Sequence, residues 1–337
     1  VQWYWRKRGG MRVCLVPLLV ALGACAIWED NTQTQLQPKI NSTGPLEFKG
    51  KVGLFVVTMG TREEHVQKFE KVMDRKIHRV SGVDAKTLHQ GHLYKDKEVI
   101  MHYCTPTKTI ALAMAHRNAI QAFLDSDYSH AVIFEDDVMI SHKWKRPYFI
   151  SSDSVLEVIA QQSDELGVDW LNLGRCVDKC LADRTVTTFI DHDVYNFEFV
   201  DSTNPMCAHS YMMNKASAKK IMKHTWPMWN VWDVMPIMMH VADRGQGNKN
   251  FKLLSITPRL FEQDRWKLKD GIHHDDNLEC GPWKQSFRYS YESEKMVFDR
   301  EMKFANVSEL MFKHYSKKCP KAYYEEPKPK LKKKKKD

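Results

Sequence analysis

The sequence predicts an α/β fold with a mainly parallel central sheet. Three observations support this prediction. Apolar runs rich in β-branched residues alternate along the chain with stretches of helical spacing, and strands that alternate with helices are typical of a parallel sheet. The runs are short and apolar throughout, as is typical of strands buried on both faces. Polar and charged residues follow directly on the runs, at the carboxyl ends of strands where such sheets bind ligands.

The predicted elements fall into two groups. The first group is a buried strand at 51–58, a helix at 61–75, a short strand at 79–84, a helix at 107–124 and a strand at 131–134. The second group is a strand at 170–173, a strand around 208–213, a helix at 215–223 and an apolar segment at 251–256. In the first helix, Glu63 and Glu64 stand in the first turn, where their charge complements the helix dipole.

Composition and charge exclude several classes of protein. The 337 residues are 43% hydrophobic and 28% charged, which excludes disordered, collagenous and multi-span membrane chains. The net charge of +9 is concentrated at the ends, because residues 6–12 contribute +4 and residues 328–337 contribute +6. Residues 13–327 therefore carry −1 and lack the basic footprint of a nucleic-acid-binding domain. We expect no specific nucleic-acid partner.

The N-terminal segment predicts entry into the secretory pathway. Residues 1–28 combine a basic flank with an apolar run at 11–28, which is the only stretch long enough to interact with a bilayer core. If uncleaved, the run is a signal anchor with type II single-pass topology. The Ala24–Ala26 pattern favours a cleaved signal peptide and a lumenal protein instead. Two further interpretations are a bacterial lipoprotein, because Leu22–Cys25 resembles a lipobox, and a misassigned start of the chain. We expect the endoplasmic reticulum or Golgi as the location.

The rest of the chain divides into a stem, a domain and a tail. Residues 29–50 read as a polar stem or linker, 51–320 as the folded domain, and 321–337 as a disordered lysine-rich tail. Six cysteines lie beyond the apolar run, and an oxidising lumen permits them to form disulfides. Cys176 and Cys180 are spaced to close a small loop or to lie as two buried thiols.

Three adjacent acids are the strongest candidate for chemistry. Glu135, Asp136 and Asp137 directly follow an apolar strand, where mutual repulsion and lost solvation cost stability unless a cation offsets them. Hard divalent ions such as Mn²⁺ or Mg²⁺ prefer oxygen ligands. Along an extended chain Glu135 and Asp137 point to one side and Asp136 to the other. A solvated acidic turn or a helix cap is the alternative interpretation.

Seven segments in order resemble a known family. They are FVVTMGTREEH, SGVDA, CTPTKTIALAMAHRNAI, AVIFEDDV, SYMMNKASAKKIM, VWDVMPIMM and ITPRLFEQD. Their order from about Val52 to about His274 resembles glycosyltransferase family 25, which contains lipopolysaccharide galactosyltransferases and collagen hydroxylysine galactosyltransferases. Ala115 replaces the usual serine before His116, Ala111-Leu112 replaces a Gly-Cys pair, and the first strand lacks an Asn-Leu pair. The chain resembles a divergent member.

The resemblance implies a fold and an activity. Family members have a GT-A-like, Rossmann-type nucleotide-sugar fold, commonly use UDP-galactose and generally transfer the sugar with inversion. We therefore expect a metal-dependent transfer of a hexose, most simply galactose, to a hydroxyl acceptor on a glycan or a protein. Glu135 and Asp137 would hold Mn²⁺ or Mg²⁺, Asp136 would position the ribose or a water, and His274 would be a late metal ligand. An exposed turn is the alternative for His274.

The same resemblance assigns a base and further donor contacts. Asp233 is the candidate base, because burial beside Trp232 could raise its pKa; a helix N-cap is the alternative. Arg62 and Thr58 would contact the nucleotide, and Asp84 would accept from the uracil or the ribose. A plain loop charge is the alternative interpretation of Arg62 and of Asp84.

His116 has two interpretations, a position near the donor phosphates or a satisfied core histidine. Its helical spacing places it on one face with Leu112, Ile120 and Phe123.

Other functions use some of the same residues. A non-catalytic glycan-binding or scaffold relative would keep the fold without turnover, and Ala115 is the feature that favours it. A phosphoryl-transfer enzyme or nuclease would also use three acids with a metal, but it would need a second acidic cluster or a phosphate-binding loop, and the chain has no G-x-x-x-x-G-K sequence. Binding of nucleic acid by the lysine tail would be independent of sequence and separable from the domain.

Overall fold

The computed structural model describes most of the predicted domain. The described residues are 50–88, 93, 107–141, 153–176, 178, 180, 183–191, 195–202, 205–245 and 250–264. The predicted N-terminal segment, the stem up to residue 49, His274 and the lysine tail lie outside the described residues. Within the described part, no helix combines the length and apolar character needed to cross a membrane.

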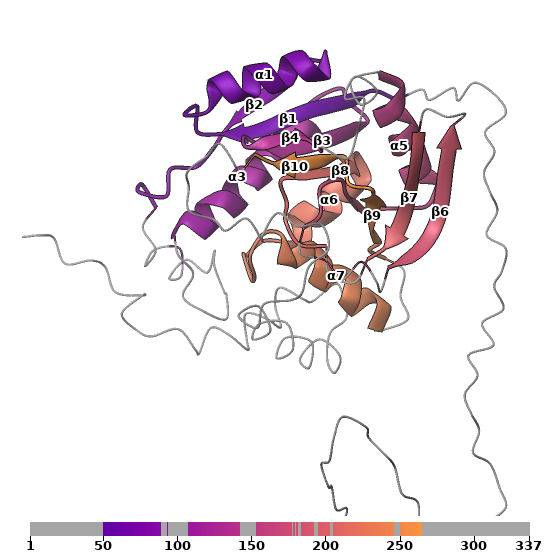
Figure 1. Cartoon of the computed structure of the whole chain (residues 1–337). Coiled ribbons are helices and arrows are strands. Elements are labelled where there is room, and N and C mark those ends of the chain that lie inside the picture. Colours follow the sequence, from indigo (N-terminus) through magenta and orange to yellow (C-terminus); the bar gives the residue numbers. More distant parts are fainter. Residues whose placement is uncertain are drawn as a thin grey trace, which may run out of the picture. The chain divides into compact units, whose positions relative to one another are not determined.

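An eight-stranded sheet forms the centre of the described chain (Figure 1). Its order is β2-β1-β3-β8-β5-β9-β7-β6. The strands are β1 (Val52–Thr58), β2 (Ile77–Ser81), β3 (His130–Glu135), β5 (Trp170–Asn172), β6 (Arg184–Asp191), β7 (Tyr195–Asp201), β8 (Ser210–Asn214) and β9 (Leu253–Thr257). A smaller sheet pairs β4 (Val138–Ile140) with β10 (Phe261–Gln263).

The main sheet is mixed, so the prediction of a mainly parallel sheet was wrong. β1 runs parallel to β2 and β3, and β5 runs parallel to β9. The other neighbours are antiparallel, because β8 lies reversed between β3 and β5, and β6 and β7 form a hairpin beside β9. Hairpin strands must be antiparallel, and β6 and β7 were not among the predicted elements. The fold class is therefore α/β with a mixed sheet.

Helices cover both faces of this sheet. They are α1 (Glu63–Met73), α3 (Thr107–Leu124), α5 (Asp153–Glu165), α6 (Lys215–His224) and α7 (Val234–Gly245). Side chains alternate along β1, so Phe55 and Val57 belong to the core beneath α3, α6 and α7, whereas Leu54 and Val56 belong to the core beneath α1 and α5. Burial on both faces explains why this strand is apolar throughout.

The parallel strands bring three chain segments to one edge of the sheet. Val57 is paired with Glu135, and Thr58 with Ser81. The backbone N of Gly82 donates to the carbonyl oxygen of Thr58 at 2.7 Å, which holds the loop after β2 beside the end of β1. The acidic triplet therefore lies at the carboxyl edge of the β1, β2 and β3 strands.

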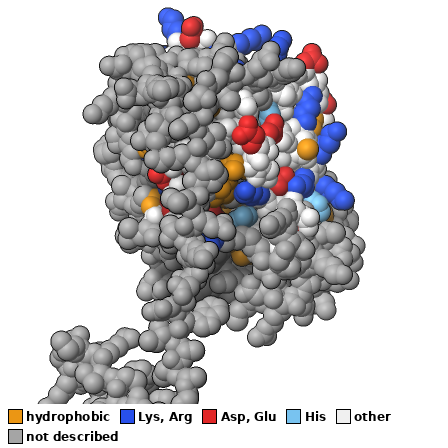
Figure 2. Space-filling view, turned by 90° about the vertical axis from the view of Figure 1, so that its right-hand side faces the viewer, with side chains coloured by type: hydrophobic (Ala, Val, Ile, Leu, Met, Phe, Trp, Pro, Cys, Tyr) orange, Lys and Arg blue, Asp and Glu red, His pale blue; other side chains and the backbone are white. Residues whose placement is uncertain are grey.

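The described residues on one face of the molecule carry charges of both signs. On the face drawn in Figure 2, basic side chains of the described residues are interspersed with acidic ones. This pattern agrees with the nearly balanced charge of residues 13–327.

Candidate active site

A cavity of about 310 Å³ opens at the carboxyl edge of β1, β2 and β3. Its described lining residues are 57–59, Arg62, 82–85, Lys108, Ala111, Leu112, Ala115 and 135–137. The structure thus gathers Thr58, Arg62, Asp84 and the acidic triplet around one space. A larger hollow of about 520 Å³ over α1 shares none of the predicted site residues.

The three acids have different hydrogen-bond partners. Glu135 Oε2 accepts a hydrogen bond from Gln263 Nε2 at 3.1 Å, and the Asp137 carboxylate lies 3.3 and 3.4 Å from the same nitrogen. Asp136 instead accepts from Thr58 Oγ1 at 2.9 Å and from Arg62 Nη1 at 3.1 Å. The carboxylates of Glu135 and Asp137 therefore converge on the amide of Gln263, although Asp136 and Asp137 lie in a turn rather than in the extended segment assumed from the sequence.

Arg62 supplies positive charge to the triplet. Its Nη1 is 3.1 Å from Asp136 Oδ1 and 3.8 Å from Asp137 Oδ2. Among the described residues it is the only arginine or lysine within ion-pair distance of the three acids. All four side chains keep part of their surface exposed.

The point where Glu135 and Asp137 converge suits a hard cation. No group of three His, Cys, Asp or Glu side chains in the described ranges has the arrangement of a metal site. The third group at this point is the amide of Gln263, and a half-turn of the amide exchanges its nitrogen for its oxygen. Two carboxylates and an amide oxygen are donors that Mg²⁺ or Mn²⁺ accepts, with substrate phosphates completing the set. His274, the other predicted ligand, lies outside the described residues.

His116 is buried behind the triplet and does not line the described cavity. Its Nε2 is 3.3 Å from Glu135 Oε1 and its Nδ1 is 3.0 Å from the Tyr211 hydroxyl. Its ring stacks on Trp232, with centroids 5.4 Å apart. The structure favours the core-histidine interpretation, with one difference: this core histidine contacts a predicted metal ligand.

Asp233 directly precedes α7. This is the position of a helix N-cap, the alternative interpretation of this residue. Its Oδ2 accepts from the backbone N of Cys207 at 3.3 Å. Burial raises the pKa of Asp233; the Cys207 N–H opposes the rise and the negative charge of Glu135 adds to it. Asp233 is near enough to Glu135 and His116 for their charges to act on it, but it is not among the residues that line the described cavity.

Gln263 and Lys108 were not among the residues predicted for the site. Gln263 reaches the triplet because β10 pairs with β4, placing Gln263 opposite Val138. The backbone N of Asp264 also donates to the carbonyl oxygen of Asp137 at 2.6 Å. More than a hundred residues separate β4 from β10, so no local pattern could reveal this contact. The one indication in the sequence was Gln263 itself, the glutamine of the segment ITPRLFEQD.

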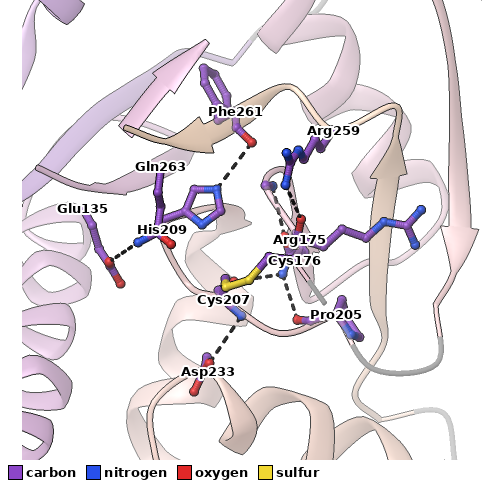
Figure 3. Close-up of a disulfide and its surroundings, with 12 residues drawn as sticks. Glu135, Arg175, Cys176, Pro205, Cys207, His209, Asp233, Arg259, Phe261 and Gln263 are labelled. Carbon is purple, nitrogen blue, oxygen red and sulfur yellow. Dashed lines mark hydrogen bonds between the residues drawn. A yellow bond between two sulfur atoms is a disulfide. The ribbon is translucent and has the colours of Figure 1, made fainter. Parts of the chain in front are cut away.

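A disulfide lies next to this region (Figure 3). It joins Cys176 to Cys207, whose Cα atoms are 5.7 Å apart, a usual separation for a disulfide. Cys176 is therefore not bonded to Cys180 in a small loop. The bond fixes the chain before β8 to the chain after β5.

Comparison of the chain with protein-family models and with curated protein sequences gives no match. The arrangement of side chains at the carboxyl edge of the sheet is therefore the main basis for proposing a function.

Proposed function

We propose that this protein is a metal-dependent glycosyltransferase with a GT-A-like fold, similar to family 25. It would move a hexose, most simply galactose, from a nucleotide sugar to a hydroxyl group of a glycan or protein, with inversion. The observation that carries the proposal is the cavity at the carboxyl edge of β1, β2 and β3. Residues predicted separately for the nucleotide and for the metal line this one space.

The cavity offers complementary groups to a nucleoside diphosphate. Glu135 and Asp137 would hold Mn²⁺ or Mg²⁺, whose chemistry is to neutralise charge on the departing diphosphate. Arg62 and Lys108 bring positive charge to the same space, and Thr58 and Arg62 hold Asp136 in place. Asp84 lines the cavity beyond β2 and can accept hydrogen bonds from ribose hydroxyls or a uracil N–H.

Asp233 is the proposed base. Inversion by direct displacement requires a group that takes a proton from the acceptor hydroxyl opposite the leaving group. A carboxylate with a raised pKa is better matched to this role than an ordinary one, and burial raises the pKa of Asp233. His116 would act through Glu135, because it contacts that carboxylate and is itself buried.

The disulfide supports the proposed location. Disulfides persist in oxidising compartments and are rare in the cytosol, and Cys176 is bonded to Cys207. This agrees with a lumenal domain in the endoplasmic reticulum or Golgi, either released or attached through residues 11–28.

The experiment that tests the proposal is hydrolysis of UDP- and GDP-sugars by the purified protein, with Mn²⁺ and with EDTA. We expect hydrolysis of one UDP-hexose with Mn²⁺ and none with EDTA. Equal hydrolysis under both conditions, or none with any donor, would contradict the proposal.

A glycan-binding relative without turnover is the second candidate. Two observations favour it: the Arg62 guanidinium already lies between Asp136 and Asp137, and Ala115 lines the cavity where the family pattern has a serine. Binding of a nucleotide sugar or glycan without hydrolysis or transfer would select this candidate.

A further inference from the structure

We infer that the Cys176–Cys207 disulfide is a positioning device for Asp233: it holds Cys207 in a backbone conformation that directs its N–H at the carboxylate. The inference rests on the proposed function, in which Asp233 is the base. It assigns Cys207 a role that no sequence motif indicated.

Cys207 has an unfavourable backbone conformation. Its φ angle is +74°, in the left-handed region that residues other than glycine rarely adopt. Such a conformation persists only where the surrounding structure imposes it, and these positions cluster at functional sites. Contacts around Cys207 must therefore hold its backbone in this conformation.

Three sets of contacts fix the segment that contains Cys207 (Figure 3). The disulfide ties its side chain to Cys176. The backbone N of Cys176 donates to the carbonyl oxygen of Met206 at 3.0 Å. The side-chain amide of Asn172 donates to the carbonyl oxygens of Pro205 and Cys207 at 3.1 and 3.2 Å. Cys207 and the two residues before it are thus attached to the end of β5 and to the chain that follows it.

The positive φ of Cys207 allows one contact with the proposed site. The Cys207 N–H donates to Asp233 Oδ2 at 3.3 Å. The charged or titratable groups that act on the same carboxylate are Glu135 and His116. A backbone donor on a braced segment orients the carboxylate more rigidly than a flexible side chain would, and misplacement of a reacting group by about 1 Å can cost about a hundredfold in rate.

Two double variants separate this positioning role from general stabilisation. Cys176→Ala/Cys207→Ala and Cys176→Ala/Cys207→Gly both lack the disulfide, but glycine adopts a positive φ without penalty and alanine does not. The first readout is hydrogen exchange of the amides of residues 206–209, which requires no activity. We expect exchange about tenfold faster in the alanine variant, the value of one lost hydrogen bond, and near the wild-type rate in the glycine variant.

The second readout is the kinetics of sugar transfer. We expect kcat to fall about a hundredfold in the alanine variant and to recover by about tenfold or more when glycine replaces alanine. The KM for the donor should stay unchanged in both, because Asp233 does not line the described donor cavity. Equal losses in the two variants, in exchange and in kcat, would overturn the inference, since a disulfide that only stabilises the fold gives no advantage to glycine.

Two controls keep the result interpretable. If either double variant fails to fold, wild-type protein treated with a reductant under native conditions replaces it, and unchanged exchange at 206–209 after reduction would overturn the inference. If wild-type protein transfers no sugar from any donor, the proposed function fails, while the exchange comparison still decides whether the disulfide fixes Cys207.

Discussion

Two groups of acidic side chains in the described chain are neutralised differently. In the first, which we call the buried arginine network, Arg175 pairs with Asp178 and Asp183, and Arg259 pairs with Glu262. Arg175 and Asp178 are 1% and 0% exposed. The second is the acidic triplet, whose described side-chain contacts include one partly exposed arginine, a histidine, a threonine hydroxyl and a neutral amide.

Under the proposed function, the difference separates acids that hold the fold from acids that would face a ligand. A buried carboxylate without a cation is very costly, so the arginines of the network must lie in fixed positions against their partners. Arg259 also donates to the carbonyl oxygen of Arg175 at 3.4 Å, which joins the two halves of the network. The triplet lines a cavity, and Glu135 and Asp137 meet at an amide whose oxygen can turn toward an incoming cation.

The largest expected effect is on turnover. Asp137→Asn and Glu135→Gln should each lower transfer about a thousandfold or more. Each replaces a charged ligand of the proposed cation, and a bound cation stabilises the transition state by several kcal/mol. The free energy of unfolding should not fall, since each change relieves repulsion between neighbouring acids. Paired assays of transfer and urea unfolding measure both. A large loss of stability with intact transfer would place these acids among the structural ones.

The reverse is expected in the buried arginine network. Arg175→Met leaves Asp178 buried without this partner and should lower the free energy of unfolding by about 3–5 kcal/mol. Arg184→Met is the matched control, because Arg184 pairs with Asp201 at an exposed position and should cost about 0–1 kcal/mol. Urea denaturation compares the two. Similar small costs for both variants would remove the distinction between the regions.

A smaller effect is expected at Asp233, and it depends on pH. Asp233→Asn should lower kcat about a hundredfold at neutral pH, because the amide cannot take the acceptor's proton. In the wild type, kcat should fall as the pH decreases through the pKa of Asp233, which burial raises above 3.8. A raised pKa also means that ionisation destabilises the folded protein as the pH rises through it, so the asparagine variant should be no less stable at pH 7. If kcat of the Asp233→Asn variant depended on pH in the same way as kcat of the wild type, Asp233 would be excluded as the base.

The smallest effect is expected at Arg62. Arg62→Gln removes the guanidinium from Asp136 and Asp137 but leaves the hydrogen bond from Thr58 to Asp136. The KM for the donor should rise about tenfold, the value of one lost hydrogen bond to a charged group, with a smaller change in kcat. Steady-state kinetics over a range of donor concentrations separate the two. An increase in transfer would mean that Arg62 competes with the cation for the acids.

Local patterns in the sequence predicted much of the fold around the site. The helix predicted at 107–124 has the same bounds as α3, and the apolar runs at 51–58 and 131–134 became β1 and β3 with ends shifted by one residue. These elements have strong periodicity or continuous burial, which local sequence records. The parallel order of β1 and β3 then placed Glu135 beside the end of β1, as expected.

Long-range pairing decided what the sequence could not predict. The reversed β8 and the β6–β7 hairpin make the sheet mixed, and pairing of β10 with β4 delivers Gln263 to the triplet. The partner of Cys176 was equally hidden, because several pairings of cysteines fit the spacing. In each case the contact depends on how distant segments pack, which no local window of sequence contains.

Binding of UDP tests most directly whether a cation shared with the donor makes the acidic triplet functional. Calorimetric titration of UDP into wild-type protein and into Glu135→Gln/Asp137→Asn, each with Mn²⁺ and with EDTA, gives four affinities. The account predicts tight binding only for the wild type with Mn²⁺. Equal affinity of the wild type in Mn²⁺ and in EDTA, or undiminished binding by the double variant, would contradict it.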